Sequence, residues 1–596
     1  MTRGTTLRIT LCVIGALAGL AYYALIDERV LSHMPVEVQR LAIYWVIALF
    51  PAFGLMAGPI RIRRAAVLSF SLATILATLV TWAGGRFDSA EAQPLDVLEP
   101  TGHGLFLIPY VILAAMFVPV LTASAKVPSD WKNYRPLFAL AWNAGVKALV
   151  AVLFLGLFWA VYLLSDALLQ LASIDLLAQV LELRYGPYLL SGAVVGIALA
   201  VTCELDRVVD TLLGLVLRLL RLLLIPVAGV MALFVIATLF QGLEEVFQRT
   251  SAAATMLGMA AGAIVLVAAG LDADDGEATQ NLALIWATRL LAVALPLIAS
   301  VAIYALWLRV DQYGWTPARL AAGLSALVVV FYVLPVTLNG INAATGWQQR
   351  TRKGFVWATM ATALIGALWF TPIIHAQKIS AASQVARLLD GRTDIDSYDF
   401  WPLAREWGIA GRQAMAELRS QPLGSKVVAA MDGAETASSR YASQQATQAF
   451  TASESWDQLT GVMPVLPADE SLPRFAAITD PFGTLNPSRI LRQCQAPEVN
   501  GLPRCVAKQS DLMLDVPGPE WLIVAQSRPG GISNGWILSR RGSDSWVWAD
   551  LGTIRRPGEN RDVVQALIDG NSKLISPQIQ GLQVGDAVFM PNPFGR

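Results

Sequence analysis

Residues 252–271 read AAATMLGMAAGAIVLVAAGL, a run of twenty residues without a charged side chain. An α-helix rises about 1.5 Å per residue, so roughly twenty apolar residues cross the ~30 Å hydrocarbon core of a bilayer. Similar runs occur throughout the first 375 residues, and the candidate spans are 7–26, 39–58, 64–83, 104–123, 137–164, 187–204, 219–241, 252–271, 285–308, 318–340 and 354–374. The pattern predicts a polytopic bundle of about eleven transmembrane helices.

The composition of the chain supports this prediction. Hydrophobic residues make up 55% of the 596 residues and charged residues only 15%, whereas soluble domains carry about 25% charged residues. This apolar content excludes an intrinsically disordered chain. The chain has 44 basic and 44 acidic residues, so its net charge is zero, which excludes nucleic-acid binding through bulk charge. Residues 1–375 carry 23 basic and 21 acidic residues, which is 44 charges, and the shorter stretch 376–596 carries the other 44. The main domain boundary is therefore expected near residue 375.

The loops between the spans predict the orientation of the chain. With a cytoplasmic N-terminus, the inside segments hold 14 basic residues, namely Arg3, Arg8, Arg61, Arg63, Arg64, Lys126, Lys132, Arg135, Arg207, Arg218, Arg221, Arg350, Arg352 and Lys353. The outside loops hold 7, namely Arg29, Arg40, Arg86, Arg184, Arg249, Arg309 and Arg319. Because Lys and Arg are enriched in cytoplasmic loops, the N-terminus is predicted inside, and an odd number of spans places the C-terminal part outside the cytoplasm.

One inside loop departs from this pattern. It holds four acidic residues and no basic one: Asp272, Asp274, Asp275 and Glu277. Acidic residues count little in the positive-inside rule, so the predicted orientation stands.

The cysteines bear on the same question. Cys494 and Cys505 are separated by ten residues that include Pro497, Gly501 and Pro503. Such a loop can close a disulfide, which forms in an oxidising compartment outside the cytoplasm. A disulfide is the prediction, and two unpaired thiols are the alternative.

Polar side chains within the spans are candidates for function, because a charge in the hydrocarbon region is costly. Lys147 lies in the middle of the 137–164 run, with Asn143 one helical turn before it on the same face. These two side chains are candidates to line a polar cavity, and the alternative is that Lys147 snorkels or pairs with another span. Arg289 is a third candidate, near enough to the end of its span to reach the interface.

Residues 203–221 form an amphipathic pattern. Arg207, Arg218 and Arg221 follow helical spacing on one polar stripe, with leucines covering much of the remaining surface. A helix of this kind lies at the interface with its arginines toward lipid headgroups. The alternative is a continuous extension of the next span, ended or bent near Pro226.

The C-terminal part changes character along its length. Residues 376–455 predict a helical connector, and 456–596 a small β-rich domain with strand-like runs at 521–525, 535–538, 545–548 and 587–590. Its tryptophans belong either to the core or to a ligand-contacting surface. The predicted fold class is therefore mainly α, with a transmembrane helical domain over 1–375 and a C-terminal extracytoplasmic α+β domain whose last part is β-rich.

No catalytic, cofactor or metal site is predicted. The three histidines, His33, His103 and His375, are scattered along the chain. Asp511, Asp515, Gly518 and Glu520 resemble a calcium loop only in composition, because their spacing differs from that of an EF-hand.

Several short motifs resemble a known family. They are Tyr313-Gly-Trp-Thr-Pro-Ala-Arg319, Ser383-Gln384-Val-Ala-Arg387-Leu388, Gly391-Arg392, Asp399-Phe400 and Gly408-Ile-Ala-Gly411-Arg412. Together they resemble the bacterial membrane family named domain of unknown function 4153, over roughly residues 1–420. The resemblance implies a bacterial inner-membrane protein and supplies no activity.

Three functions are compatible with these observations. The leading hypothesis is an inner-membrane protein whose periplasmic domain binds or senses an envelope component or a partner protein. The second is a transporter or lipid-handling protein that uses Lys147 and Asn143, and the third is a membrane enzyme. The lipid bilayer is an expected partner and nucleic acid is not, while the sequence makes no prediction of oligomeric state.

Overall fold

The computed structural model describes residues 3–27, 30–87, 98–100, 104–172, 174–204, 206–241, 252–274, 281–342, 346–395, 398–481, 484–495, 504–513, 516, 518–526, 533–541, 545–554, 562–574, 582–584 and 587–589. The chain forms two compact units. The first comprises Met1–Thr393 and Pro402–Leu418, and the second comprises Asp394–Trp401 and Arg419–Arg596.

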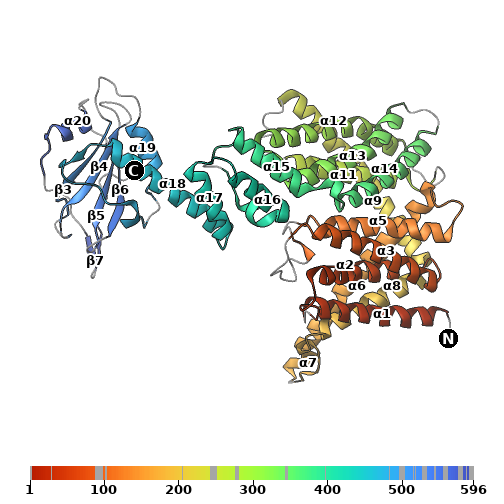
Figure 1. Ribbon diagram of the computed structural model, residues 1–596. Helices are drawn as coiled ribbons and strands as arrows, with labels where there is room; N and C mark the ends of the chain where they lie inside the picture. The colour runs from red at the N-terminus through yellow and green to blue at the C-terminus, as the bar shows by residue number, and fades with distance from the viewer. Residues whose placement is uncertain are drawn as a thin grey trace. The chain divides into compact units, whose positions relative to one another are not determined.

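The described part of the first unit consists of helices (Figure 1). The long ones are α1 (Arg3–Ile26), α2 (Val36–Met56), α3 (Ile62–Gly84), α5 (Leu107–Lys126), α6 (Tyr134–Leu171), α8 (Gly186–Glu204), α9 (Asp206–Gln241), α11 (Ala252–Leu271), α12 (Leu282–Tyr313), α13 (Pro317–Asn342) and α14 (Trp347–Trp369). The shorter ones are α7 (Leu176–Glu182), η1 (Pro372–Ile374), α15 (Ala376–Leu389), the π-helical turn η3 (Pro402–Glu406) and α16 (Gly408–Arg419).

The predicted membrane spans coincide with these helices. Among the described residues, ten helices are long and apolar enough to cross a membrane, from α1 to α13 without α7. The eleventh predicted span corresponds to α14, which is followed at an angle of 67° by the segment Pro372–Leu389. The prediction of a mainly α, polytopic bundle is confirmed.

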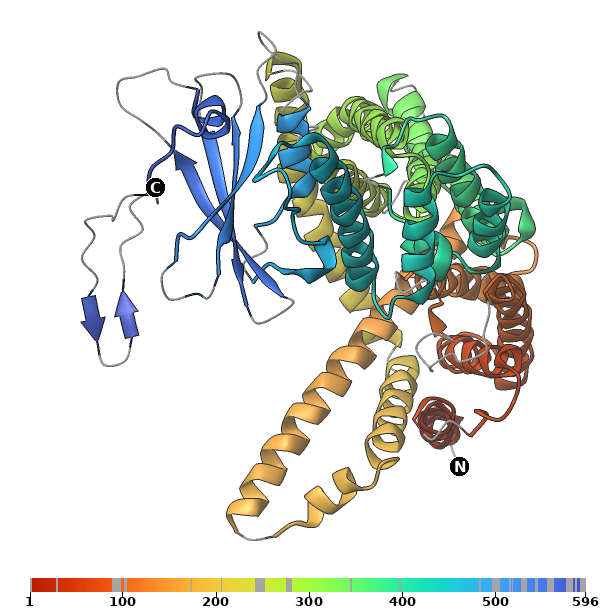
Figure 2. The ribbon, with the colours of Figure 1, turned by 60° about the vertical axis from the view of Figure 1, so that its left-hand side comes forward.

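The helices pack around two hydrophobic cores. The first core is formed mainly by α2, α3 and α5, with Tyr44, Met56 and Tyr110 fully buried. The second is formed by α9, α11, α12 and α13, with Leu224 and Leu291 fully buried. Figure 2 shows that α6 extends past its neighbours, before the chain returns through α7 to α8.

Helix α1 is held against α8 by four glycines. A Cβ atom at Gly15 of α1 would lie 2.1 Å from the carbonyl oxygen of Gly192 in α8, and one at Gly192 would lie 2.0 Å from that of Gly15. Gly19 and Gly196 approach the opposite backbone equally closely, at 2.0 and 2.1 Å. Gly15 and Gly19 on α1, like Gly192 and Gly196 on α8, have the Gly-x-x-x-Gly spacing that lets two membrane helices pack backbone against backbone.

The second unit contains a six-stranded sheet with helices on both faces. Its order is β1 (Val465–Leu466), β3 (Cys505–Ser510), β4 (Glu520–Gln526), β5 (Ser533–Arg540), β6 (Trp546–Ile554) and β2 (Ile478–Thr479). The four central strands are antiparallel neighbours, while β1 runs parallel to β3 and β2 runs parallel to β6. The helices are α17 (Ser425–Thr436), α18 (Arg440–Val462), α19 (Pro487–Cys494) and α20 (Val563–Ile568), with a short turn η4 (Phe475–Ala477) and a separate pair β7 (Leu582–Val584) and β8 (Ala587–Phe589).

Both faces of this sheet are covered, which explains the continuous apolar run in β4. Successive side chains of a strand point to opposite faces. Trp521 and Ile523 therefore join the core under α18 and α19, whereas Leu522 and Val524 pack with α20 on the other face. The tryptophans at 456, 521, 536 and 548 are at most 5% exposed, so they belong to the core and not to a ligand-contacting surface.

Cys494, at the end of α19, and Cys505, at the start of β3, form the predicted disulfide. Their Cα atoms are 5.3 Å apart. The bond ties the helical layer to the sheet. Cys12 is half-buried and Cys203 is buried, and neither is in a disulfide.

The glycine contact gives a first prediction. Gly192→Ala adds a methyl group where only backbone of α1 is available to give way, so we expect it to destabilise the protein by about 1–3 kcal/mol, the usual cost of overpacking. The measurement is the unfolding of the purified protein in detergent, followed by circular dichroism.

Gly262→Ala in α11 is the matched control. Nothing lies within 4 Å of a Cβ atom at Gly262, so the same substitution should leave stability unchanged or raise it by up to about 1 kcal/mol. Equal losses for the two variants would show that the α1–α8 contact is not a determinant of stability.

Candidate functional site

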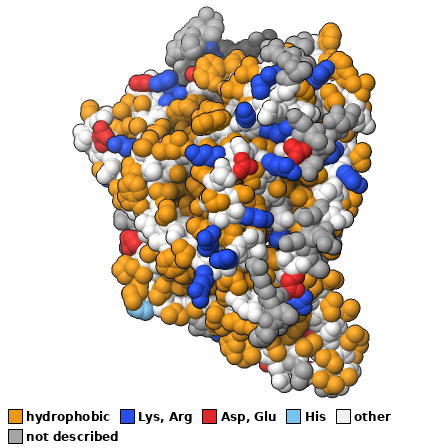
Figure 3. All heavy atoms as spheres, turned by 90° about the vertical axis from the view of Figure 1, so that its right-hand side faces the viewer, with side chains coloured by type: hydrophobic (Ala, Val, Ile, Leu, Met, Phe, Trp, Pro, Cys, Tyr) orange, Lys and Arg blue, Asp and Glu red, His pale blue; other side chains and the backbone are white. Residues whose placement is uncertain are grey.

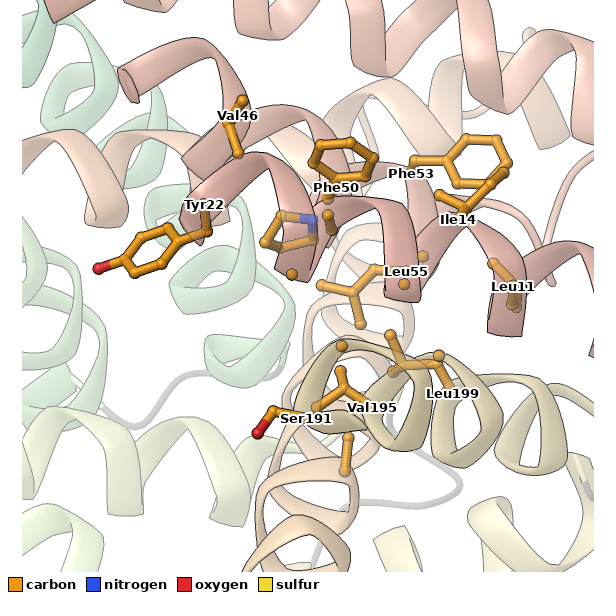
Figure 4. Close-up of a pocket in the computed structure, with 18 of the residues that line it drawn as sticks. Leu11, Ile14, Tyr22, Val46, Phe50, Phe53, Leu55, Ser191, Val195 and Leu199 are labelled. Carbon is orange, nitrogen blue, oxygen red and sulfur yellow. The ribbon is translucent and has the colours of Figure 1, made fainter. Parts of the chain in front are cut away.

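Four helices of the first unit surround a cavity of about 490 Å³. It lies between α1, α2, α6 and α8 (Figure 4). Figure 4 shows Leu11, Ile14 and Tyr22 of α1 and Phe50 and Phe53 of α2 on one side. The side chains of Ser191, Val195 and Leu199 approach from α8.

Small residues create this space. Gly15 and Gly19 of α1 and Gly192 and Gly196 of α8 line the cavity, and α6 contributes Ala148, Ala151 and Val152. Pro51 lies within α2 at the same cavity, where it removes one backbone hydrogen-bond donor from the helix. The glycines that bring α1 and α8 together therefore also keep the adjoining space unfilled.

The lining is almost entirely apolar. No charged side chain is among the described residues that line the cavity. The polar groups are the hydroxyls of Tyr22, Tyr188 and Ser191, and Ser191 Oγ accepts a hydrogen bond from Trp159 Nε1 at 3.0 Å. The rings of Tyr22 and Tyr188 are 6.1 Å apart. Such a site accommodates an apolar group and offers little to a charged one.

Lys147 and Asn143 lie beside this cavity but do not line it. Lys147 is 2% exposed, and its Nζ is 3.7 Å from Sγ of Cys203 in the last turn of α8. Gly58, just after α2, packs against the same thiol, because a Cβ atom there would lie 2.3 Å from Sγ. The ammonium group is thus enclosed by protein where α2 and α8 end, and Asn143 is half-buried one turn earlier in α6.

The other intramembrane candidate, Arg289, lies in the early part of α12. Its guanidinium group is 5.2 Å from the ring centroid of Trp286, and its Nε has no hydrogen-bond partner among the described residues. Neither Arg289 nor Trp286 lines the cavity between α1, α2, α6 and α8.

The arginines of the amphipathic stretch belong to one continuous helix. Helix α9 runs from Asp206 to Gln241 with Pro226 inside it, so residues 206–221 extend the next span. Arg218 is exposed, Arg221 forms an ion pair with Asp272, and the side chain of Arg207 lies outside the described residues.

Arg221 and a second arginine satisfy the last carbonyl groups of α11. Arg221 Nε donates to the oxygen of Ala269 at 2.9 Å. Arg352, at the start of α14 and 5% exposed, donates to the carbonyl oxygens of Leu271 and Asp272. Asp272 has a positive φ of 51°, which ends the helix. The last carbonyls of a helix lack partners within it, and here arginines from two other helices provide them.

These contacts explain the acidic loop that lacks basic residues of its own. Asp272 pairs with Arg221, and Asp274 is 3.4 Å from Nη1 of Arg135. At the same end of the bundle Arg8 donates from Nε to Glu204 at 2.8 Å. The segments that hold the basic residues are therefore linked to one another, and Figure 3 shows many lysine and arginine side chains on this face.

Two of the family motifs, those at 313–319 and 383–388, contact each other. Gln384 Nε2 in α15 donates to the carbonyl oxygens of Tyr313 and Trp315, at 2.8 and 3.0 Å. Arg387 donates to Asp311 and Gln312 at 2.7 and 2.6 Å, at the end of α12. Gly314, with φ of 73°, leaves room for these side chains, because a Cβ atom there would lie 2.6 Å from Arg387 Cδ. Side chains of α15 thus stabilise the turn between α12 and α13 through hydrogen bonds to its backbone.

In the part of the chain that the structure describes, no three His, Cys, Asp or Glu side chains gather as a metal ion would require. Glu520 is fully buried, and its Oε2 accepts hydrogen bonds from the amides of Leu512 and Met513 at 2.7 and 3.2 Å. The Glu520 carboxylate therefore binds backbone amides that precede it by seven and eight positions in the chain. Asp515 lies outside the described residues.

The long apolar helices define an integral membrane protein of the multi-pass α-helical class. A family model described as a domain of unknown function (DUF4153) matches residues 41–403, and the chain belongs to this family. The resemblance of the sequence motifs is thereby confirmed. No curated protein and no solved structure matches the chain.

The contacts at the end of α11 generate a prediction. Arg352→Ala leaves buried carbonyl groups without donors, so we expect it to destabilise the protein by about 1–3 kcal/mol. Arg218→Ala removes the same charge from an exposed position on α9 and should change stability by no more than about 0.5 kcal/mol. Thermal unfolding in detergent compares the two, and similar shifts would contradict the capping role.

Proposed function

We propose that this chain is a lipid-handling protein of the bacterial inner membrane, whose membrane unit holds an acyl chain between α1, α2, α6 and α8. The observation that carries the proposal is the apolar cavity of about 490 Å³ at the level of the spans. Its volume lies within the usual range of about 300–1,000 Å³ for small-molecule sites.

The lining favours an acyl chain over a polar solute. A transported ion or polar molecule needs groups that replace its hydration, and the described lining supplies only three hydroxyls. Lys147, the strongest intramembrane candidate of the sequence, directs its ammonium group to Cys203. A lipid chain requires no such groups, and the bilayer around a membrane protein supplies lipid at high concentration.

Filling the cavity tests this proposal. Ala148 is exposed within it, and Ala148→Phe should exclude one acyl chain without a clash against backbone. The measurement is the number of phospholipids that remain bound to the purified protein in native mass spectrometry. We expect one lipid fewer than in the wild type.

Ala139→Phe is the matched control on the same helix. Ala139 is also exposed and does not line the cavity, so this variant should retain the wild-type number of lipids. An unchanged lipid count for Ala148→Phe would rule out the cavity as an acyl-chain site.

A second candidate function concerns the C-terminal unit. We infer that this unit lies in the periplasm and binds or senses an envelope component or a partner protein. The basic segments predicted to be cytoplasmic gather at one end of the bundle, which supports a cytoplasmic N-terminus. The disulfide between Cys494 and Cys505 supports an oxidising compartment for the C-terminal unit.

Thiol labelling in intact cells tests this orientation. Ala468→Cys introduces an exposed thiol in the C-terminal unit, and Ser129→Cys introduces one between α5 and α6. A membrane-impermeant maleimide should label position 468 in intact cells and position 129 only after permeabilisation, with the parent protein as background. The reverse pattern would place the C-terminal unit in the cytoplasm.

A further inference from the structure

A second cavity, of about 400 Å³, lies at the basic end of the membrane unit. It is formed by the turn between α5 and α6 and by the first half of α14. The lining residues are Trp131, Lys132, Asn133, Tyr134, Lys353, Val356, Trp357 and Met360. None of them lines the cavity between α1, α2, α6 and α8, so the two sites are independent.

Two lysines in this cavity have no carboxylate partner among the described residues. Lys132 and Lys353 are exposed, and neither forms an ion pair within the part of the chain that the structure describes. The nearby arginines differ in this respect, because Arg135 pairs with Asp274 and Arg352 satisfies the end of α11. The acidic residue of the turn, Asp130, accepts a hydrogen bond from Asn133. Two positive charges therefore flank one cavity.

Aromatic side chains line the same cavity as these charges. The Nζ of Lys132 is 5.3 Å from the ring centroid of Trp131. Trp357 is 76% exposed, although it is a large apolar side chain on a membrane-spanning helix. Tryptophan is enriched where the headgroups of a bilayer meet its hydrocarbon, so the pair of tryptophans indicates that the cavity lies at this depth.

Along one face of α14, the side chains change from charged to apolar. Lys353, Trp357, Met360 and Leu364 follow steps of three and four residues, which place them on the same face. Leu364 is 60% exposed, as expected for a side chain that contacts lipid. A cation, an aromatic ring and two aliphatic side chains thus follow one another, which is the order that complements the phosphate, the glycerol region and the acyl chain of a phospholipid.

We propose that this cavity binds an anionic phospholipid. Lys132, in the turn before α6, and Lys353 of α14 contact its phosphate. Trp357 lies at its glycerol region and Met360 lies along its acyl chain. A basic pocket between transmembrane helices at the cytoplasmic side is a known arrangement for acidic headgroups. A zwitterionic lipid gains less, because its own cation opposes the two lysines.

Lipid binding to the purified full-length protein in detergent tests the site. The probes are dioleoylphosphatidylglycerol, dioleoylphosphatidylcholine and inorganic phosphate, with affinities measured by native mass spectrometry. We expect the wild type to prefer phosphatidylglycerol. Each lysine near an anionic headgroup contributes about fivefold in affinity, so the K132Q/K353Q double variant should bind this lipid about 30-fold more weakly.

Two further variants separate the site from its surroundings. Arg63→Gln combined with Lys126→Gln removes two exposed charges from the same end of the bundle outside the cavity and should keep the preference. Trp357→Ala keeps both lysines, so it should weaken phosphatidylglycerol binding and leave the weak binding of inorganic phosphate unchanged. Because all of these side chains are exposed, the variants are expected to fold, which the unfolding midpoint without lipid verifies.

Three results would overturn the proposal. The first is a K132Q/K353Q variant that keeps the wild-type preference for phosphatidylglycerol. The second is an equal loss in the variant at positions 63 and 126, which would assign the effect to the overall charge of this face. The third is inorganic phosphate that binds as tightly as phosphatidylglycerol, which would make a free phosphate the ligand.

Discussion

The last carbonyl groups of a membrane-spanning helix have no partner within that helix, and in this protein arginines from other helices supply one. Arg221 and Arg352 do so for α11, and Arg387 does so for α12. A charged side chain is costly in the hydrocarbon and inexpensive at the helix ends, where it also opposes the negative end of the helix dipole. The same side chains therefore fix which helix ends lie together and leave the middle of the bundle apolar.

That apolar middle is packed in two different ways. Where glycines face each other, as in α1 and α8, the helices approach backbone to backbone, and the small side chains beside them leave the cavity between four helices. Elsewhere, large side chains such as Tyr44, Tyr110 and Leu291 are fully buried between helices. Under the proposed function, the space left beside the glycines holds an apolar ligand. The lysine-lined cavity at the first half of α14 has the opposite character, because two charged side chains line it.

The features that could be predicted from sequence share one property, which is that they depend on a local stretch of chain. The spans followed from length and hydropathy, and the disulfide from two cysteines eleven positions apart. The amphipathic stretch 203–221 had two interpretations, since the pattern does not reveal whether the helix continues, and α9 is continuous. The glycine pairs of α1 and α8 carry a recognisable Gly-x-x-x-Gly signal that the hydropathy of their spans conceals.

The sequence by itself determined which segments can cross a membrane and at which end their positive charges gather, because the cost of burying a charge or an unpaired backbone group in hydrocarbon applies to each segment separately. Only the tertiary structure decided which side chains meet. Lys147 lies against Cys203, 56 positions away, and not in the cavity beside it, and Arg387 reaches the last turn of α12 across 75 positions. Such contacts depend on how helices pack in three dimensions, and the spacing of residues along the chain does not encode that packing.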